Sequence, residues 1–284
     1  MMAREAHIAG DGVPEVTTLP GTSSASALQP GLGQDPEHHD LKQSNRVHSE
    51  LALGQRRLRS SFSSSVARTL KAGGTMGTAT GSNGGIHHLR AGWACQFSAL
   101  AYGCRAIVYV YLPGDVIGLD TLLRTRPLEN VLTLTSVTVE TIPVRDVLTE
   151  LMADRPTALF VAWLLGERQR RTDRLLAGIS GLDARGRVAM MVLDFYTRLR
   201  RRKLTTGSTF SLPLTQVQIG DYLGLTVVHV NRVLRSLRDE RIVNLERHCV
   251  TILDLDRLTS LAQNGRTGSS NTEVSDRRLA EAAD

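Results

Sequence analysis

Polar and cationic side chains recur at helical spacing near residue 230, in a pattern suited to contacts with nucleic acid. Asn231, Arg232 and Arg235 lie one to four positions apart, so on a helix they would share one side. Guanidinium and amide groups offer paired hydrogen bonds that match base edges and phosphate oxygens. The outward face of such a helix would comprise Val227, Val228, Asn231, Arg232, Arg235 and Arg238.

Two short helices joined by a tight turn are expected to position this face, within residues 213–241. Thr215 and Gln218 have the spacing of a capping box, which predicts the start of the first helix. Gly224 predicts the turn, because glycine adopts a positive φ at the lowest cost, and Thr226 can cap the second helix. The apolar sides would be Val217, Ile219, Tyr222 and Leu223 on the first helix, and Val230, Val233, Leu234 and Leu237 on the second.

Residues 241–253 indicate two strands around a turn near Arg247 and His248. A hairpin directly after such a helix makes a winged helix-turn-helix. Gly220, in the first helix, lets another backbone approach closely because it has no side chain. The alternative is an ordinary helical hairpin whose arginines only keep one face solvated; the hairpin that follows favours a DNA-reading module.

The charge distribution points to a polyanionic partner. The 284-residue chain carries a net charge of +6, and residues 182–263 contain 13 Arg and Lys against 8 Asp and Glu. Three cysteines, Cys95, Cys104 and Cys249, make no disulfide framework, which together with the absence of an early apolar run predicts a cytoplasmic protein. No stretch approaches the roughly 20 apolar residues of a membrane span.

The N-terminal half divides by composition. Residues 1–65 are rich in Gly, Ser, Thr, His and Pro and are expected to form a disordered leader. Residues 92–97, 106–112 and 131–142 are β-branched and aromatic runs that predict the strands of a small antiparallel roll. The glycine-laden stretch 71–91 favours no strand.

Helices are expected from Pro143 onward. The first two should span residues 144–153 and 157–180, and an amphipathic third should span 183–200. One side of the second comprises Ala158, Val161, Leu165, Leu175 and Ile179. This narrow stripe favours dimer packing, with packing against the chain's own roll as the alternative. The basic run 200–203 could contact phosphates or simply remain solvated, and a polar tail is expected to be disordered.

These modules, in this order, resemble the Crp/Fnr superfamily of bacterial transcription regulators over residues 69–261. The residues that carry the resemblance are Gly92-Trp-Ala-Cys, Tyr102-Gly103, Leu112-Pro-Gly-Asp-Val-Ile-Gly-Leu119, Leu182-Asp-Ala-Arg-Gly-Arg187 and the run 214–245. The resemblance implies an α+β fold: an N-terminal antiparallel β roll of the cyclic-nucleotide-binding type, a long dimerisation helix and a C-terminal winged helix-turn-helix. The expected domains are a leader at 1–65, the roll at 66–150, the helix at 151–181, the DNA-binding domain at 182–262 and a tail at 263–284.

The resemblance further implies a homodimeric regulator that binds a pseudo-palindromic DNA site, with RNA polymerase as another partner. By position, Val227, Val228 and Arg232 would face base edges, and Gln216, Thr226 and His229 would face phosphates. Thr215, Asn231 and Arg235 complete the expected DNA-binding set. Arg232 is the candidate for direct readout, because a guanidinium can bond both O6 and N7 of guanine.

The roll is not expected to bind a cyclic nucleotide tightly, and we predict no cofactor and no metal. Where cyclic-nucleotide binders of the family have a Gly-Glu pair, Gly118 is followed by Leu119, and Arg126 lacks a serine partner. Thr172 falls near the base-contacting position of the long helix but carries little weight alone. No cysteine cluster precedes Cys95, so an iron–sulfur centre is not implied.

Other functions remain as alternatives. Inert, buried thiols are expected at Cys95 and Cys104, with redox sensing as the less favoured reading. An enzyme is not expected, because the sequence has no nucleophile elbow, phosphate-binding glycine loop or metal-ligand spacing. The remaining alternatives are a protein-interaction module that no longer reads DNA and a cyclic-nucleotide-responsive regulator.

Overall fold

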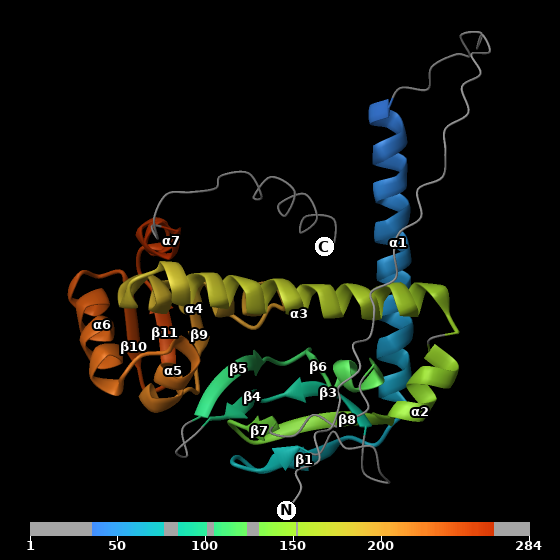
Figure 1. The fold of residues 1–284 in the computed structure, drawn as a ribbon, viewed down its shortest axis with the longest axis horizontal. Coiled ribbons are helices and arrows are strands. Elements are labelled where there is room, and N and C mark those ends of the chain that lie inside the picture. Colours follow the sequence, from blue (N-terminus) through green and yellow to red (C-terminus); the bar gives the residue numbers. More distant parts are fainter. Residues whose placement is uncertain (1–35, 77–84, 101–104, 124–130, 152, 264–284) are drawn as a thin grey trace, which may run out of the picture. The chain divides into compact units, whose positions relative to one another are not determined.

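The computed structural model describes residues 36–76, 85–100, 105–123, 131–151 and 153–263, apart from the side chains of residues 36–45, 150 and 151 (Figure 1). The chain forms two units, residues 1–42 and 43–284. Of the first unit, the structure describes only the beginning of helix α1 (Pro36–Ser63). The roll and the C-terminal helices all belong to the second unit.

The predicted antiparallel roll is confirmed, as two four-stranded sheets. One has the order β1-β8-β3-β6 and the other the order β2-β7-β4-β5. The strands of the first are β1 (Arg68–Leu70), β8 (Val137–Pro143), β3 (Gly85–Ala91) and β6 (Val116–Ile117), and those of the second are β2 (Thr75–Met76), β7 (Val131–Thr133), β4 (Ala94–Ala99) and β5 (Arg105–Tyr111). Leu89, Tyr111 and Val139 pack in the core between them. The short 3-10 helix η2 (Leu119–Leu123) follows β6.

Two details of the roll differ from the sequence prediction. Strand β3 lies inside the glycine-laden stretch that predicted no strand, where it pairs with β8. Gly85 suits this pairing, because a Cβ there would lie 2.8 Å from the carbonyl oxygen of Ile142. The run 131–142 forms two strands, β7 and β8, in different sheets. Residues 113–115 form the turn after β5, in which the Asp115 amide donates to the Leu112 carbonyl at 2.9 Å.

Helix α1 contradicts the expectation of a disordered leader for residues 36–63; residues 1–35 lie outside the described residues. Leu58 and Phe62 are 2% and 1% exposed, and they pack with Ile142 and Phe160. Gly54 allows the close contact, because a Cβ there would lie 2.0 Å from the carbonyl oxygen of Pro156. The helix is therefore held by residues distant in sequence, which composition alone does not reveal.

Helices follow the roll as predicted. Helix α2 (Val144–Asp146) continues into the π-helical turn η3 (Val147–Leu151), and the long helix α3 (Arg155–Gly181) comes next. Asp154 caps α3 by accepting from the Thr157 amide at 3.1 Å. Asp183 caps helix α4 (Ala184–Arg201) in the same way, accepting from the Gly186 amide at 2.8 Å.

The stripe on α3 that was expected to form the dimer contact packs inside the chain instead. Val161 is 2% exposed and packs with α1 residues, and Leu175 is 9% exposed in the cluster that includes α4. Ala158, Leu165 and Ile179 are half-buried. This is the alternative of packing against the chain's own roll, because the cluster of Val161 includes Ile86 and Ile142 of the roll; α1 and α4 add to the contact. The opposite side of α3 is exposed, including Trp163 and Leu176.

The C-terminal part is a winged helix. Its helices are α5 (Gln216–Leu223), α6 (Val227–Asp239) and α7 (Leu255–Gln263), and its sheet has the order β10-β11-β9. The strands are β9 (Thr209–Ser211), β10 (Val243–Glu246) and β11 (Cys249–Ile252). Phe195 of α4, Leu223 of α5 and Leu237 of α6 are fully buried in one shared core. The polar tail at 264–284 lies outside the described residues.

Candidate nucleic-acid interface

The turn between α5 and α6 forms as its sequence predicts. The Thr215 hydroxyl accepts from the Gln218 amide at 3.2 Å, and the Gln218 side chain accepts from the Thr215 amide at 2.8 Å. Gly224 adopts φ 65°, the left-handed conformation that closes α5. A Cβ at Gly220 would lie 2.5 Å from the carbonyl oxygen of Leu225, so only glycine lets the turn fold back onto α5.

Helix α6 has one buried and one exposed face. The Thr226 hydroxyl caps it by accepting from the His229 amide at 3.3 Å. The buried side chains are Val230, Val233 and Leu237, and Leu234 is half-buried. Val228, on the other side, is 67% exposed. The predicted division of this helix is confirmed, and the apolar face anchors it while the cationic face remains free.

The first helix of the pair differs at one position. Val217 was expected on the apolar side of α5, but its side chain is 55% exposed. A residue two positions before Ile219 is turned about 200° round a helix, so Val217 points away from the buried Ile219 and Leu223. The helical period alone predicts this orientation of the Val217 side chain. Val217 therefore belongs to the exposed surface beside Gln216.

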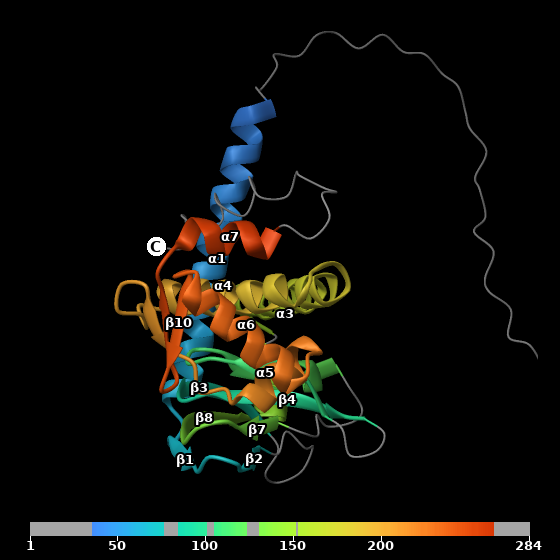
Figure 2. The ribbon, with the colours of Figure 1, turned by 90° about the vertical axis from the view of Figure 1, so that its left-hand side faces the viewer.

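All nine residues of the expected DNA-binding set are exposed, in two groups. Thr215 and Gln216 stand at the start of α5. The second group lies at the start and along the outer face of α6 and comprises Thr226, Val227, Val228, His229, Asn231, Arg232 and Arg235. Figure 2 views the side of the molecule that carries α5, α6 and β10. The cap hydroxyls use an oxygen lone pair, so each still has a proton to donate to a phosphate.

The arginines of the winged helix divide by their partners. Arg185 and Arg257 pair with Glu240 at 2.8 and 3.1 Å, and Arg187 donates to the carbonyl of Leu223. Within the described residues, no ion pair involves the three arginines of the α6 face, Arg232, Arg235 and Arg238. Their positive charge is therefore available to an anionic partner.

The wing forms where the sequence predicts it. Strands β10 and β11 pair with Glu246 opposite Cys249, and the turn between them holds Arg247 and His248 at φ 49° and 64°. Both turn side chains are exposed. Within the basic run 200–203, Arg202 pairs with Asp115 of the roll and is not available to a phosphate. The other three residues of the run are exposed.

An arginine of α3, Arg168, reaches across to the roll. Arg168 hydrogen-bonds the Gln96 side chain and lies 3.3 Å from Asp120. Its guanidinium carbon is 5.3 Å from the ring centre of Tyr109 and 5.8 Å from that of Tyr111. These contacts tie the long helix to the interior face of the roll.

Leu119 and Thr172, at candidate ligand-binding positions, and the thiol of Cys95 differ in how far they are buried. Leu119 is 4% exposed in the cluster beneath α1, and Thr172 is exposed, with its hydroxyl donating to the Arg168 carbonyl. Burial raises the pKa of the Cys95 thiol to about 11, which disfavours the reactive thiolate. Arg126 and Cys104 lie outside the described residues. Among the residues that are described, none form a group suited to a metal ion, and no helix is long and apolar enough to cross a membrane.

Replacing Thr226 with alanine is expected to lower the free energy of unfolding by about 1 kcal/mol, because the His229 amide loses its capping acceptor. Urea denaturation measures this change. Thr226→Ser keeps the acceptor and serves as the control, with stability close to wild type. Equal losses in the two variants would show that the hydroxyl does not cap α6.

Comparisons with known proteins agree on one family. A Crp-like helix-turn-helix domain model matches residues 186–261. The "Anaerobic regulatory protein" of Haemophilus influenzae is 26% identical over 190 residues, which cover 66% of this chain and 71% of that protein. The "Transcriptional activator protein anr" of Pseudomonas aeruginosa is 29% identical over 181 residues, covering 63% of this chain and 73% of that one.

Solved structures share the fold. FixK2 from Bradyrhizobium japonicum superposes with a TM-score of 0.62 at 20% identity, over 72% of this chain and 99% of that one. A Crp-family transcriptional regulator from Thermus thermophilus gives a TM-score of 0.55 at 19% identity, over 71% and 100% of the two chains. With the winged helix and the roll in the same order, these comparisons support a transcription regulator of the Crp/Fnr superfamily.

Proposed function

We propose that the protein regulates transcription by binding, as a homodimer, a pseudo-palindromic DNA site through helix α6. The observation that carries the proposal is the outer face of α6, where Arg232 and Arg235 are exposed without ion-pair partners among the described residues. A helix held from behind by three buried side chains, with cations in front, suits insertion into a major groove.

Within this proposal the exposed residues have different roles. Arg232 reads a guanine by donating to O6 and N7 together, and Val227 and Val228 contact thymine methyl groups. Gln216, Thr226 and His229 bind phosphates, which fixes the register of the helix on the duplex. Thr215, Asn231 and Arg235 complete the contact surface. Because the Val228 side chain accepts no hydrogen bond from a base, the preferred site should differ from one that a carboxylate at this position would select.

A second copy would pair along the exposed side of α3. The residues of this seam are Ala162, Gly166, Gln169, Asp173, Leu176 and Ser180, all exposed and spaced alternately four and three apart. That alternation is the spacing of a coiled-coil seam, and the small residues let two helices approach closely. The proposal places the dimer in the cytoplasm, with RNA polymerase as a further partner and regulation, not catalysis, as its activity.

The signal that the roll receives is not a tightly bound cyclic nucleotide in this proposal. Leu119, at the position where the resemblance implies a glutamate in nucleotide binders, is buried in an apolar cluster. Arg168 of α3 lies against the two roll tyrosines and is already paired with Gln96 and Asp120. Neither feature offers the free acceptor and donor groups that a ribose and a phosphate require.

The test begins by selecting bound fragments from random DNA. Arg232→Ala is expected to weaken binding to the enriched site by ~1–3 kcal/mol, because a bidentate contact to guanine is lost. Gel shifts of the selected site at two salt concentrations measure the change, and affinity should fall steeply with salt as phosphates are neutralised. Arg59→Ala, an exposed arginine on α1, removes the same charge away from α6 and is expected to bind as wild type.

Two outcomes would contradict the proposal. Unchanged specific binding by Arg232→Ala would remove Arg232 from direct readout. Failure of the selection to enrich any sequence would favour the alternative of a protein-interaction module that no longer reads DNA.

A further inference from the structure

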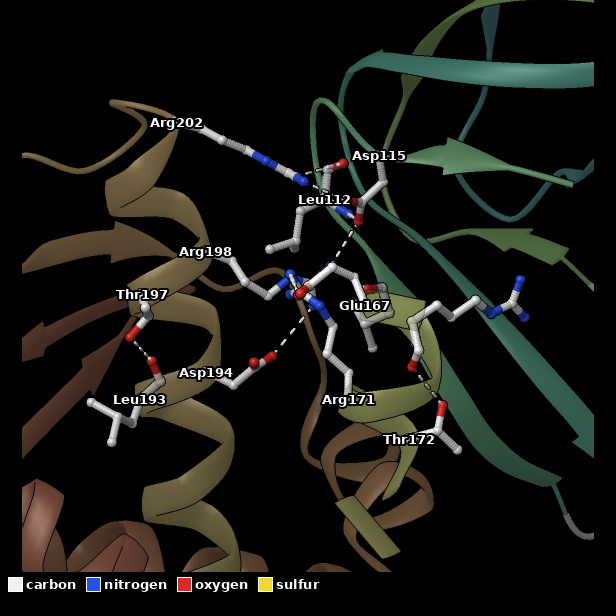
Figure 3. A network of polar contacts seen from close by, with 12 residues as sticks. Leu112, Asp115, Glu167, Arg171, Thr172, Leu193, Asp194, Thr197, Arg198 and Arg202 are labelled. Carbon is white, nitrogen blue, oxygen red and sulfur yellow. Dashed lines mark hydrogen bonds and ion pairs between the residues drawn. The ribbon is translucent and has the colours of Figure 1, made fainter. Parts of the chain in front are cut away.

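We propose that Asp115 of the roll is a two-point latch that fixes the orientation of the winged helix, and so sets the spacing of the two α6 helices in the dimer. This inference deepens the proposed function and rests on it for the part that concerns DNA. It starts from a buried cluster of charges that DNA binding does not use (Figure 3).

The carboxylate of Asp115 is fixed within the roll. One of its oxygens, Oδ2, accepts from the Leu112 amide at 2.8 Å, and the Asp115 amide donates back to the Leu112 carbonyl at 2.9 Å. The Gly114 amide donates to the carbonyl of Leu89 in β3 at 2.6 Å. The turn between β5 and β6 is therefore tied to the sheet. The Asp115 carboxylate is held in place with it and would not move if a partner side chain moved.

Two arginines four positions apart, Arg198 on α4 and Arg202 at the C-cap of that helix, hold this turn from the other side. Arg198 donates to Asp115 Oδ2 at 2.7 Å and to the Val110 carbonyl at 2.9 Å. Arg202 donates to Asp115 Oδ1 at 2.5 Å and to the Pro113 carbonyl at 2.6 Å. Each carboxylate oxygen thus has its own guanidinium, and each guanidinium also holds a carbonyl of the roll. Two separate points of attachment prevent rotation as well as displacement.

Burial makes this contact sensitive to position. The side chains of Arg198 and Asp115 are 5% and 12% exposed, and Asp194 lies 3.4 Å from the other side of Arg198. Around them, Leu112 packs with Phe195 in one apolar cluster. Apolar burial is non-directional, whereas a displaced buried charge loses its partner. The cluster therefore supplies adhesion, and the ion pairs select one orientation.

Helix α4 transmits that orientation to the DNA-binding face. The ring of Phe195 stacks on Tyr222 of α5 at 5.9 Å, and Arg187 donates to the Leu223 carbonyl at 3.3 Å. Helix α5 in turn holds α6, because the Leu225 amide donates to the Gly220 carbonyl at 3.0 Å. A shift of α4 on the roll would therefore carry α6 with it.

Distances between spin labels test the latch in the full-length protein. One label is attached to the native Cys249 of β11, which is exposed, and the other to Thr69→Cys on β1, in a Cys104→Ser background. Cys95 is buried, and its burial raises the pKa of the thiol, which disfavours labelling there. Mixing labelled protein with an excess of unlabelled protein confines the signal to distances within one chain. The variants are Asp115→Asn and Arg202→Gln, with Arg201→Gln, an exposed neighbour, as the control.

Wild type and Arg201→Gln are expected to give one narrow distance distribution. We expect Asp115→Asn to broaden it at least twofold, and Arg202→Gln, which leaves the Arg198 contact intact, to broaden it less. Affinity for the selected DNA site should fall about fivefold or more in the same order, with non-specific affinity unchanged. Circular dichroism determines whether each variant is folded. If Asp115→Asn is not folded, the milder Arg202→Gln variant is used for the test.

A folded variant that lacks the contact yet keeps the wild-type distance distribution would overturn the latch. Broadening without any loss of specific affinity would overturn its role in spacing the α6 helices. The distances are recorded without DNA, so a failure of the selection experiment counts against the proposed function and leaves the latch measurement intact.

Discussion

Replacing Phe62 with alanine is expected to lower the free energy of unfolding by about 3–5 kcal/mol. The side chain is 1% exposed and lies in the cluster formed by α1, Ile142 and Phe160, with its ring 5.4 Å from that of His88. Truncation removes this burial and leaves a cavity that the surrounding strands and helices can fill only in part. Urea denaturation of the full chain measures the loss.

The matched control for this experiment is Val66→Ala. Val66 lies four residues from Phe62 and is 85% exposed, so its truncation should change stability by less than about 0.5 kcal/mol. Equal, small effects of the two substitutions would mean that α1 is not part of the cooperative fold.

The α1 contacts that Phe62 stabilises also support the beginning of helix α3. Arg57 pairs with Asp154, the residue that caps α3, and Gly54 lies against Pro156 in the first turn of the same helix. Helix α1 therefore braces the beginning of the helix that we propose to pair two copies. Loss of the α1 contacts should weaken the start of α3 before it affects the winged helix.

The winged helix was predictable because its signals are local. The capping box at Thr215 and Gln218, the left-handed Gly224 and the cap at Thr226 each act within a few residues of their own position. The turn at residues 247 and 248 is equally short-ranged. The exposed cationic face of α6 then follows from helical periodicity alone, whatever the rest of the chain does.

The features that sequence reasoning missed depend on distant partners. Phe62 gains a core only from residues such as Ile142 and Phe160, which are 80 and 98 positions away in the sequence. Strand β3 exists because β8 pairs with it, despite its glycine-rich approach. Helical periodicity predicts the apolar stripe on α3, but it does not say whether such a stripe packs against the same chain or against a second copy.

The charge cluster at Asp115 is the extreme case of a long-range contact. Asp115 and Arg198 are 83 positions apart, and the sequence offers only a turn motif at one end and a basic run at the other. The same basic run suggested phosphate contacts, yet Arg202 is committed to the roll. A run of charges therefore says little about function until the partners of each member are known.

Replacing Arg198 alone with methionine is expected to lower the free energy of unfolding by about 3–5 kcal/mol, because Asp115 then keeps its buried charge with one guanidinium fewer. The double variant Asp115→Leu/Arg198→Met should recover most of this loss. It removes both buried charges and leaves side chains of suitable size for the apolar surroundings. Arg202 is 29% exposed, so it can turn to solvent once the carboxylate is gone.

The pH dependence of stability provides an independent reading of the same pair. Burial would raise the pKa of Asp115, but Arg202 and Arg198 outweigh it and hold the pKa at about 2, below the ordinary value of 3.8. A carboxyl with a lowered folded pKa contributes stability that is complete above pH ~4 and is lost as the pH falls towards 2. Wild type should therefore lose more stability over this interval than the double variant does. If the single and double variants are equally unstable, or if their acid profiles match that of wild type, the ion pair does not make this contribution, and the apolar cluster alone joins the roll to α4.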